Sequence, residues 1–151
     1  DLYAATKDLE RAVEAYVEAA RARGELAMLT SQRYSSVYAA VDGLVEAHVN
    51  QSWELFRRVA GGSGGADREA ALGALKAAGD QLARALALCD EVLPAPDLHK
   101  MHRRRQLYYA LLREAVTAAL TFVDTGRQEM ADLAEERLRD ALQQRPGGGE
   151  R

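Results

Sequence analysis

Apolar residues recur three and four positions apart along almost the whole chain of 151 residues, and only three prolines interrupt the pattern. That spacing places an apolar stripe along one side of a helix, and such a stripe must be buried against other helices. The pattern therefore predicts an all-α protein. Its clearest run alternates between the two spacings without a break: Leu72, Leu75, Gly79, Leu82, Leu86, Cys89 and Leu93.

Glycines, prolines and capping residues divide the chain into five predicted helices. Gly24 is expected to end the first helix, because glycine readily adopts the left-handed conformation found at helix C-termini. Asp67 and Asp97 are expected to cap the third and fourth helices. The second helix is expected to begin near Glu25 or, alternatively, near Thr30 or Ser31. The predicted spans are 2–23, 25–59, 67–93, 97–125 and 128–144, with a glycine-rich connector at 61–65.

Short connections between long helices make neighbours in sequence antiparallel neighbours in space. The prediction is an antiparallel up-down four-helix bundle with a shorter fifth helix that folds back along the fourth. One domain is expected over residues 1–144, with a disordered tail at 145–151. A chain of this length is large enough to bury a continuous hydrophobic core without metal ions or disulfides. Its single cysteine excludes an internal disulfide.

Charge and hydropathy exclude several functional classes. The formal net charge is −3, so general attraction to nucleic acid or to an anionic membrane is not expected. The basic run from Lys100 to Arg105 is short and belongs to no recognisable nucleic-acid-binding module. The longest uncharged apolar stretch, from Ala115 to Val123, is too short to span a bilayer. We therefore predict neither nucleic-acid binding nor a membrane span.

In the predicted topology, basic residues gather at the pole that holds the first–second and third–fourth connections. The fifth helix is expected to end before it reaches Arg105, with Asp140 near Arg113, and so to leave these cations unscreened. Several of them lie in the first turns of the fourth helix, where they oppose the helix dipole at about 0.3–1 kcal/mol each. The residues are Arg21, Arg23, Arg33, Lys100, Arg103, Arg104 and Arg105.

Two interpretations of this basic pole remain open. In the first, a small anionic ligand or an acidic protein segment docks there. In the second, nearby carboxylates neutralise it as surface ion pairs, which contribute little to stability. The carboxylates available for that role are Glu25, Asp90, Glu91 and Asp97.

Five of the six tyrosines fall at one level of the predicted bundle, roughly 10–20 Å from the basic pole at 1.5 Å per residue. Arg105 occupies an apolar stripe position just above them, where it must snorkel, pair or face a polar cavity. Together they are expected to line a pocket for an anionic or aromatic molecule. Alternatively, Arg105 stacks on the rings and the hydroxyls contact water. The tyrosines are Tyr16, Tyr34, Tyr38, Tyr108 and Tyr109.

Motifs for cofactors and catalysis are scarce. His99 and His102 have a spacing that brings two imidazoles toward one metal ion, but they lie beside several cations. His48 lies on an apolar stripe, far along the bundle from that pair, and is interpreted as a core residue. No Glu-x-x-His pair or Cys-x-x-Cys-His sequence occurs in the chain. We therefore predict no cofactor and no catalytic constellation.

The sequence thus predicts a non-catalytic helical-bundle binding domain that recognises an acidic partner segment or a small anionic ligand at a basic, tyrosine-lined pole. One alternative is a scaffold that self-associates, as a homodimer, through an apolar face containing Trp53 and Phe56. Another is a metal- or haem-binding bundle that uses His48 or the His99 and His102 pair. The predicted ligand-binding residues are Arg103, Arg104, Arg105, Tyr34, Tyr38, Tyr108 and Tyr109.

Overall fold

The computed structural model describes residues 2–24 and 31–147, with side chains described for 7–24 and 32–147. This part contains five α-helices and no β-strand, which confirms the predicted all-α class. No helix in it is long and apolar enough to cross a membrane. The elements are α1 (Leu2–Ala22), α2 (Ser31–Ala60), α3 (Gly65–Glu91), the 3-10 turn η2 (Pro96–Leu98), α4 (His99–Thr125) and α5 (Gln128–Gln143).

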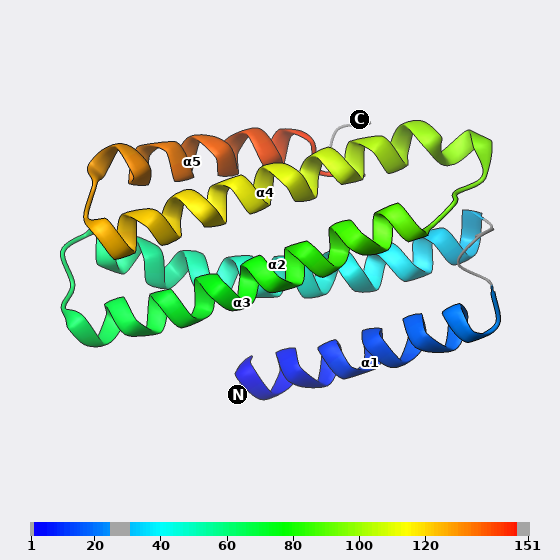
Figure 1. Cartoon of the computed structure of the whole chain (residues 1–151), viewed down its shortest axis with the longest axis horizontal. Coiled ribbons are helices and arrows are strands. Elements are labelled where there is room, and N and C mark those ends of the chain that lie inside the picture. The colour runs from blue at the N-terminus through cyan, green and yellow to red at the C-terminus, as the bar shows by residue number, and fades with distance from the viewer. Residues whose placement is uncertain (1, 25–30, 148–151) are drawn as a thin grey trace.

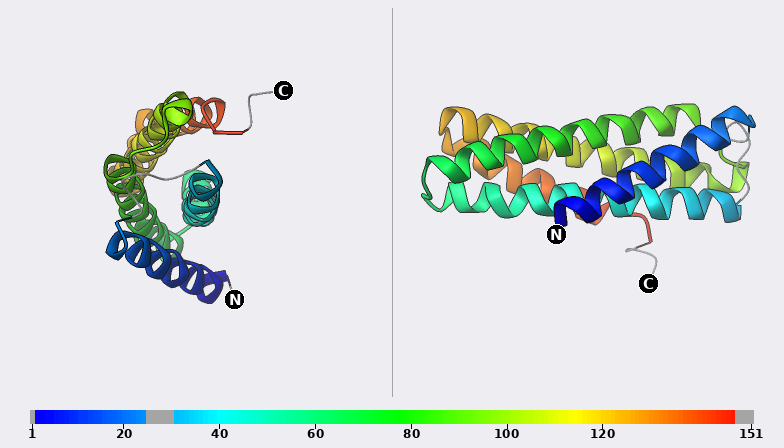
Figure 2. Two further views of the ribbon diagram at one scale, coloured as in Figure 1. Left: turned by 90° about the vertical axis from the view of Figure 1, so that its right-hand side faces the viewer. Right: turned by 90° about the horizontal axis from the view of Figure 1, so that it is seen from below.

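Successive helices run antiparallel, as the short connections predict (Figure 1). The helices α3 and α4 pack side by side, α2 packs on both, and α5 lies along α4. Seen along the long axis, α5, α4, α3 and α1 form a curved layer with α2 on its concave side (Figure 2). The helix α1 packs mainly on α2 and is the most peripheral element.

The helix boundaries follow the sequence except around α3 and at the start of α4, where Asp97 lies within η2 and does not cap the helix, because Leu98 is the N-cap residue. Gly126 has a φ of 73° and ends α4, as expected for a glycine at a helix C-terminus. Asp67 does not cap α3, because the helix begins at Gly65 and the carboxylate lies within its first turn. The helix α3 also ends earlier than predicted, at Glu91, because a residue before proline disfavours the helical conformation. The predicted start of the second helix at Glu25 lies outside the described residues.

Two arginines bind the free carbonyl groups at the C-termini of neighbouring helices. Arg68, in the first turn of α3, donates to the carbonyls of Val123 and Asp124 at 2.9 Å each. Arg104, on α4, donates to the carbonyls of Gln143 and Gln144 at 3.2 Å each. The last carbonyls of a helix lack partners within the helix, so these bonds anchor α4 to α3 and α5 to α4. The fifth helix stops short of the basic pole, as predicted, and ends at Gln143 (Figure 1). The prediction that it leaves all the cations there unscreened is wrong for Arg104, whose side chain reaches the end of α5.

An aromatic cluster fills the core at the end of the bundle near the α2–α3 connection. Trp53 packs on Phe56 with ring centroids 4.9 Å apart, and Phe56 meets Phe122 edge to face at 5.7 Å. Trp53 and Phe56 are both buried. These two rings therefore do not form the exposed apolar face predicted for self-association, because they pack into this chain's own core.

Candidate functional site

A buried polar cluster occupies the end of the bundle near the α3–α4 connection. Its centre is Arg105, which is 7% exposed and sits on the apolar stripe of α4. The guanidinium donates from Nε and Nη2 to the two oxygens of Asp42 on α2, at 3.3 and 2.9 Å. The Tyr109 hydroxyl donates to the same carboxylate. Asp42 thus supplies the paired charge that a buried arginine requires.

A hydrogen-bonded chain extends this cluster across three helices. Arg105 Nη1 donates to the Tyr34 hydroxyl at 3.0 Å, and that hydroxyl lies 3.1 Å from His102 Nδ1. On the other side of the ring, His102 Nε2 lies 2.8 Å from the carbonyl of Cys89. A carbonyl only accepts, so we assign the ring proton to Nε2, which leaves Nδ1 to accept from Tyr34. The chain joins α2, α3 and α4.

The hydrogen bonds of His102 argue against the predicted metal site. Both ring nitrogens of His102 already have protein partners, and His99 is exposed at the surface. Among the residues that the structure describes, no three His, Cys, Asp or Glu side chains are grouped so as to hold a metal ion. His102 therefore has no free ring nitrogen with which to bind the metal ion that was predicted for it and His99.

Arg105 also stacks on two of the tyrosines. Its Cζ atom lies 4.8 Å from the ring centroid of Tyr38 and 5.4 Å from that of Tyr34. The Tyr38 hydroxyl is directed at Cys89 Sγ, 3.6 Å away. Burial raises the pKa of Tyr34, Tyr38 and Tyr109 above the ordinary range, and it raises the pKa of the Cys89 thiol to about 11. Arg105 thus stacks on the rings, as in the alternative prediction. The hydroxyls of Tyr34 and Tyr38, which that alternative expected to contact water, bond to protein groups.

The predicted ligand-binding residues consequently separate into several groups. Four of them, Tyr34, Tyr38, Arg105 and Tyr109, are buried against one another, so the pocket expected between them is filled. Tyr16, expected in the same layer, lies on α1 with 42% of its surface exposed and makes none of the ring contacts described for this cluster. Arg104 binds the end of α5, and Arg103 is exposed. Tyr108 lines a different feature, a groove.

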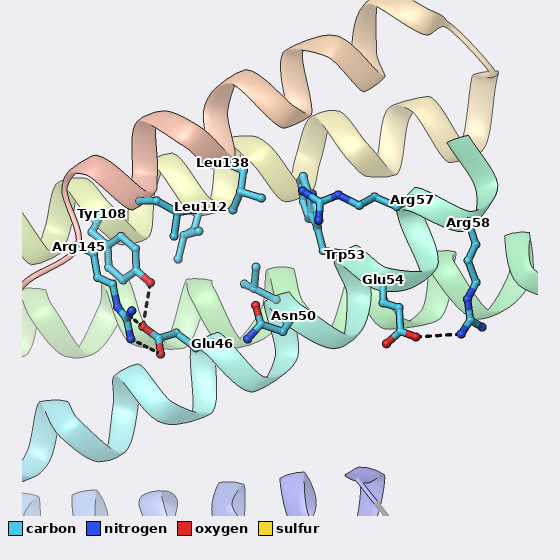
Figure 3. A pocket seen from close by; sticks show the side chains of 12 residues that line it. Glu46, Asn50, Trp53, Glu54, Arg57, Arg58, Tyr108, Leu112, Leu138 and Arg145 are labelled. Atoms are coloured by element: carbon cyan, nitrogen blue, oxygen red, sulfur yellow. Dashed lines mark hydrogen bonds and ion pairs between the residues drawn. The ribbon is translucent and has the colours of Figure 1, made fainter. Parts of the chain in front are cut away.

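This groove lies between α2 and α5, with α4 as its floor, and has a volume of about 720 Å³ (Figure 3). Leu138 and Leu112 point into it from α5 and α4 (Figure 3). Leu142, on α5, is 53% exposed along its edge, although it is a large apolar side chain. The apolar lining consists of Val49, Trp53, Tyr108, Leu112, Leu138 and Leu142.

Polar bridges between α2 and the α5 segment close both ends of the groove. At one end, Glu46 pairs with Arg145 at 2.8 Å and accepts a hydrogen bond from the Tyr108 hydroxyl at 3.2 Å (Figure 3). At the other end, Glu135 accepts from Arg57 at 3.0 and 3.1 Å and from Trp53 Nε1 at 3.3 Å. These bonds from Arg57 lower the pKa of the Glu135 carboxyl. The two bridges link α2 to the α5 segment on either side of the apolar stretch.

Sequence reasoning did not identify the acidic residues of these sites. Asp42 anchors the cluster and Glu46 anchors one end of the groove, and neither was among the predicted site residues. Arg145 was placed in the predicted disordered tail, yet it is held by Glu46. Residues 148–151 of that tail lie outside the described residues.

His48 lies apart from these features, on α2. Its Nε2 atom is buried and, among the described residues, has no hydrogen-bond partner. Burial lowers the pKa of this imidazole. The residue lies beside a pocket of about 260 Å³ walled by small residues of α3. Nothing brings it near His99 or His102.

The chain was compared with family models, with curated proteins and with solved structures, and none of them matches. Its functional interpretation therefore depends on the geometry described above. Two features carry that interpretation: a closed polar cluster that joins three helices, and an open apolar groove beside it.

Proposed function

We propose that this protein is a non-catalytic binding domain that holds an acidic, amphipathic helical segment of another protein in the groove between α2 and α5. The observation that carries the proposal is the apolar lining between two helices, in which the partly buried Leu138 and the exposed Leu142 of α5 lie above a floor of buried apolar side chains. Helical walls around an apolar floor are the arrangement in which an amphipathic helix is commonly bound.

The spacing of the end bridges limits the length of the guest. Glu46 and Arg57 are eleven residues apart on α2, which corresponds to roughly 16 Å along the helix. A guest helix of about three turns fits that length, with apolar anchors at i, i+3 or i+4, and i+7. Because the buried cluster fixes α2 against α4, the groove is formed before binding, and little ordering entropy is lost.

Charges at the ends of the groove favour an acidic guest. At the far end, Arg57 and Arg58 lie on the lining, and Arg139 is close enough to lower the pKa of Glu135. At the near end, Arg145 lines the groove and Arg104 binds the last carbonyls of α5 beside it. The three lining arginines each pair with one glutamate, Arg145 with Glu46, Arg58 with Glu54 and Arg57 with Glu135, so the positive excess at the two ends comes from Arg104 and Arg139 beyond the lining. Carboxylates flanking the apolar anchors of a guest would therefore be attracted.

This proposal keeps the acidic partner predicted from the sequence but moves it from the basic pole to the groove. Arg105 is committed to Asp42 and Arg104 to α5, so the pole offers fewer free donors than its composition indicates. A small inorganic anion would gain nothing from the apolar lining. A helical segment uses both the apolar surface and the flanking charges.

Trp53 provides the test, because it is the only tryptophan of the chain and it lines the groove. Two synthetic helical peptides of about three turns, with leucines at the anchor positions and either glutamates or lysines at both ends, are titrated against the protein. We expect the glutamate peptide to change Trp53 fluorescence and to bind more tightly than the lysine peptide. Equal binding of the two peptides, or binding of neither, would overturn the proposal.

A matched pair of variants locates the binding. Leu142→Glu places a charge on the groove edge and should abolish binding. Leu107→Glu changes a leucine that is 46% exposed and does not line the groove, so it should leave binding intact. If the protein sediments as a dimer that Leu142→Glu dissociates, the groove is occupied by a second copy, and the proposed partner is wrong.

A further inference from the structure

A second apolar space lies on the opposite side of α2, under α1. In the view from below, α1 runs obliquely across α2 and α3 (Figure 2). Between the three helices is a cleft of about 360 Å³, which is within the range of small-molecule sites. Val13 and Val17 of α1 face this cleft and are only partly buried. The remaining apolar lining is Val41, Leu44, Val45, Ala85, Ala87 and Leu88.

The helix α1 is attached to α3 across this cleft by polar side chains. Arg84 pairs with both Glu10 and Glu14 at 2.9 Å, and the buried Gln81 donates to Glu10 at 2.8 Å. Further along, Arg21 pairs with Glu91 at 2.7 Å. These arginines are about half exposed, and exposed ion pairs hold weakly, at about 0–1 kcal/mol each.

The rim of the cleft is acidic. Arg21 is shared between Glu18 and Glu91, and Arg84 between Glu10 and Glu14. Lys7 adds one cation, 3.5 Å from Glu10, at the outer side of this group. Each arginine is thus already occupied by two carboxylates, and four carboxylates face three cations. An anionic head group would have to displace a glutamate, whereas a cationic head group would pair with the excess.

We infer that this cleft is a binding site for a small amphiphile that has an apolar body and a cationic, ammonium-type end. The apolar body lies among the valines and leucines of α1, α2 and α3. The cationic end lies at the rim, beside Glu14 and Glu18 of α1. Gln81, which is 7% exposed, is the buried polar side chain of the cleft wall, and its bond to Glu10 fixes the α1 side of the rim. This site is independent of the groove between α2 and α5.

The test compares decyltrimethylammonium with decanoate, two probes with the same apolar chain and opposite charge, below their micelle concentrations and at equal ionic strength. Calorimetric titration of the full chain should show the ammonium probe binding roughly threefold to tenfold more tightly, as expected for attraction at a partly exposed rim. Equal affinities, a preference for decanoate, or no binding of either probe would overturn the inference.

Methyl NMR spectra give the position of the bound probe. The ammonium probe should shift the methyl signals of Val13, Val17 and Leu88, and leave those of Leu138 and Leu142 unchanged. Shifts at the last two leucines would place the probe in the α2–α5 groove and overturn the assignment of the cleft. This readout separates the cleft from the proposed peptide site, because each site has its own reporter residues.

Charge variants test the acidic rim. Glu14→Gln with Glu18→Gln should weaken binding of the ammonium probe roughly threefold and leave decanoate no weaker. The matched control is Glu69→Gln with Glu136→Gln, which removes the same charge from exposed positions that do not line the cleft. If both double variants reduce ammonium binding equally, the preference reflects net charge, and the rim has no specific role.

Discussion

The guanidinium of Arg105 and the carboxylate of Asp42 form a two-point ion pair between α4 and α2 in the buried end of the bundle. Only 8% of the Arg105 side chain and 19% of the Asp42 side chain are exposed, so water can replace little of this pairing. The same two residues hold the hydroxyls of Tyr34 and Tyr109. The pair is therefore the centre of the polar cluster that fixes α2 against α4.

Removing one partner of this pair should be costly. Asp42→Ala leaves a buried cation without its counter-charge, and we expect it to lower the free energy of unfolding by about 3–5 kcal/mol. Urea denaturation measures this change. The control is Glu54→Ala, which breaks the exposed Arg58–Glu54 pair and should change the free energy by about 0.5 kcal/mol or less. Similar values for the two variants would show that the buried pair does not stabilise the fold.

The buried tyrosines should make the stability of the fold depend on pH in the alkaline range. Burial raises the pKa of Tyr34, Tyr38, Tyr108 and Tyr109 in the folded protein, whereas an unfolded tyrosine ionises near pH 10. The stability they contribute is therefore fully present below about pH 10 and is lost as the pH rises above that value.

A spectrophotometric titration tests this prediction through phenolate absorbance, with circular dichroism as the measure of folding. Four of the six tyrosines should ionise only in the transition in which helicity is lost. Ionisation of all six before any loss of helicity would contradict the closed cluster.

His48 should make the protein sensitive to mild acid. Burial lowers the pKa of its imidazole in the folded state, and the nearby Lys7 and Arg84 act in the same direction, while Glu10 opposes them. The unfolded chain therefore takes up a proton more readily below about pH 6.5, and stability falls as the pH drops from that value through the folded pKa.

The variant His48→Leu removes both the titration and the unpartnered Nε2 atom. We expect it to be at least as stable as the wild type near neutral pH, with an advantage that grows toward about pH 5. Thermal denaturation across this range measures the difference. Parallel curves for the two proteins would show that His48 does not titrate on unfolding.

Arg104 should hold the end of α5. Arg104→Met removes two donors from the carbonyls of Gln143 and Gln144, and we expect it to cost about 0.5–1.5 kcal/mol. Amide hydrogen exchange in the last turn of α5 should accelerate with little change in α3. The neighbouring Arg103→Met is the control, because Arg103 is exposed, and unchanged exchange in both variants would refute the capping role.

Much of the fold could be predicted because it follows from local chemistry. The three-four spacing identified the helices, and Gly126 marked the turn into α5, where a positive φ suits glycine. The end of α3 was missed because the apolar stripe continues through Leu93, although Pro94 restricts that residue and leaves it 63% exposed. Asp67 lies in the first turn of α3, where a carboxylate is favourable near the helix dipole without capping it.

The convergence of Tyr34, Tyr38 and Arg105 could also be predicted, because residues of antiparallel helices that lie at the same distance from one end of the bundle are neighbours in space. Their mutual burial could not, because it depends on Asp42. A signal was present: Asp42 is four residues after Tyr38 and three before Val45, so it lies in a row of apolar residues on one side of α2. A carboxylate in an apolar row needs a buried cation, and Arg105 is the one that faces it.

The groove could not be predicted, because it depends on how far apart α2 and α5 lie. Residues at equal distances before and after the turn at Gly126 lie side by side on α4 and α5, which predicts the positions of their Cα atoms. It does not predict the reach of the long side chains of Arg104 and Arg145, which extend well beyond their own turns to Gln144 and Glu46. Arg145 makes one of the two bridges between α2 and the α5 segment, and Arg104 binds the end of α5 to α4.

Selection from a displayed library of random helical peptides of about three turns tests the central claim most directly, because it assumes no guest sequence. The wild-type chain should enrich peptides with apolar residues at i, i+3 or i+4, and i+7, and with more acidic than basic flanks. Those peptides should bind Leu107→Glu as well as the wild type and fail to bind Leu142→Glu. Enrichment of basic peptides, no enrichment, or undiminished binding to Leu142→Glu would contradict the account.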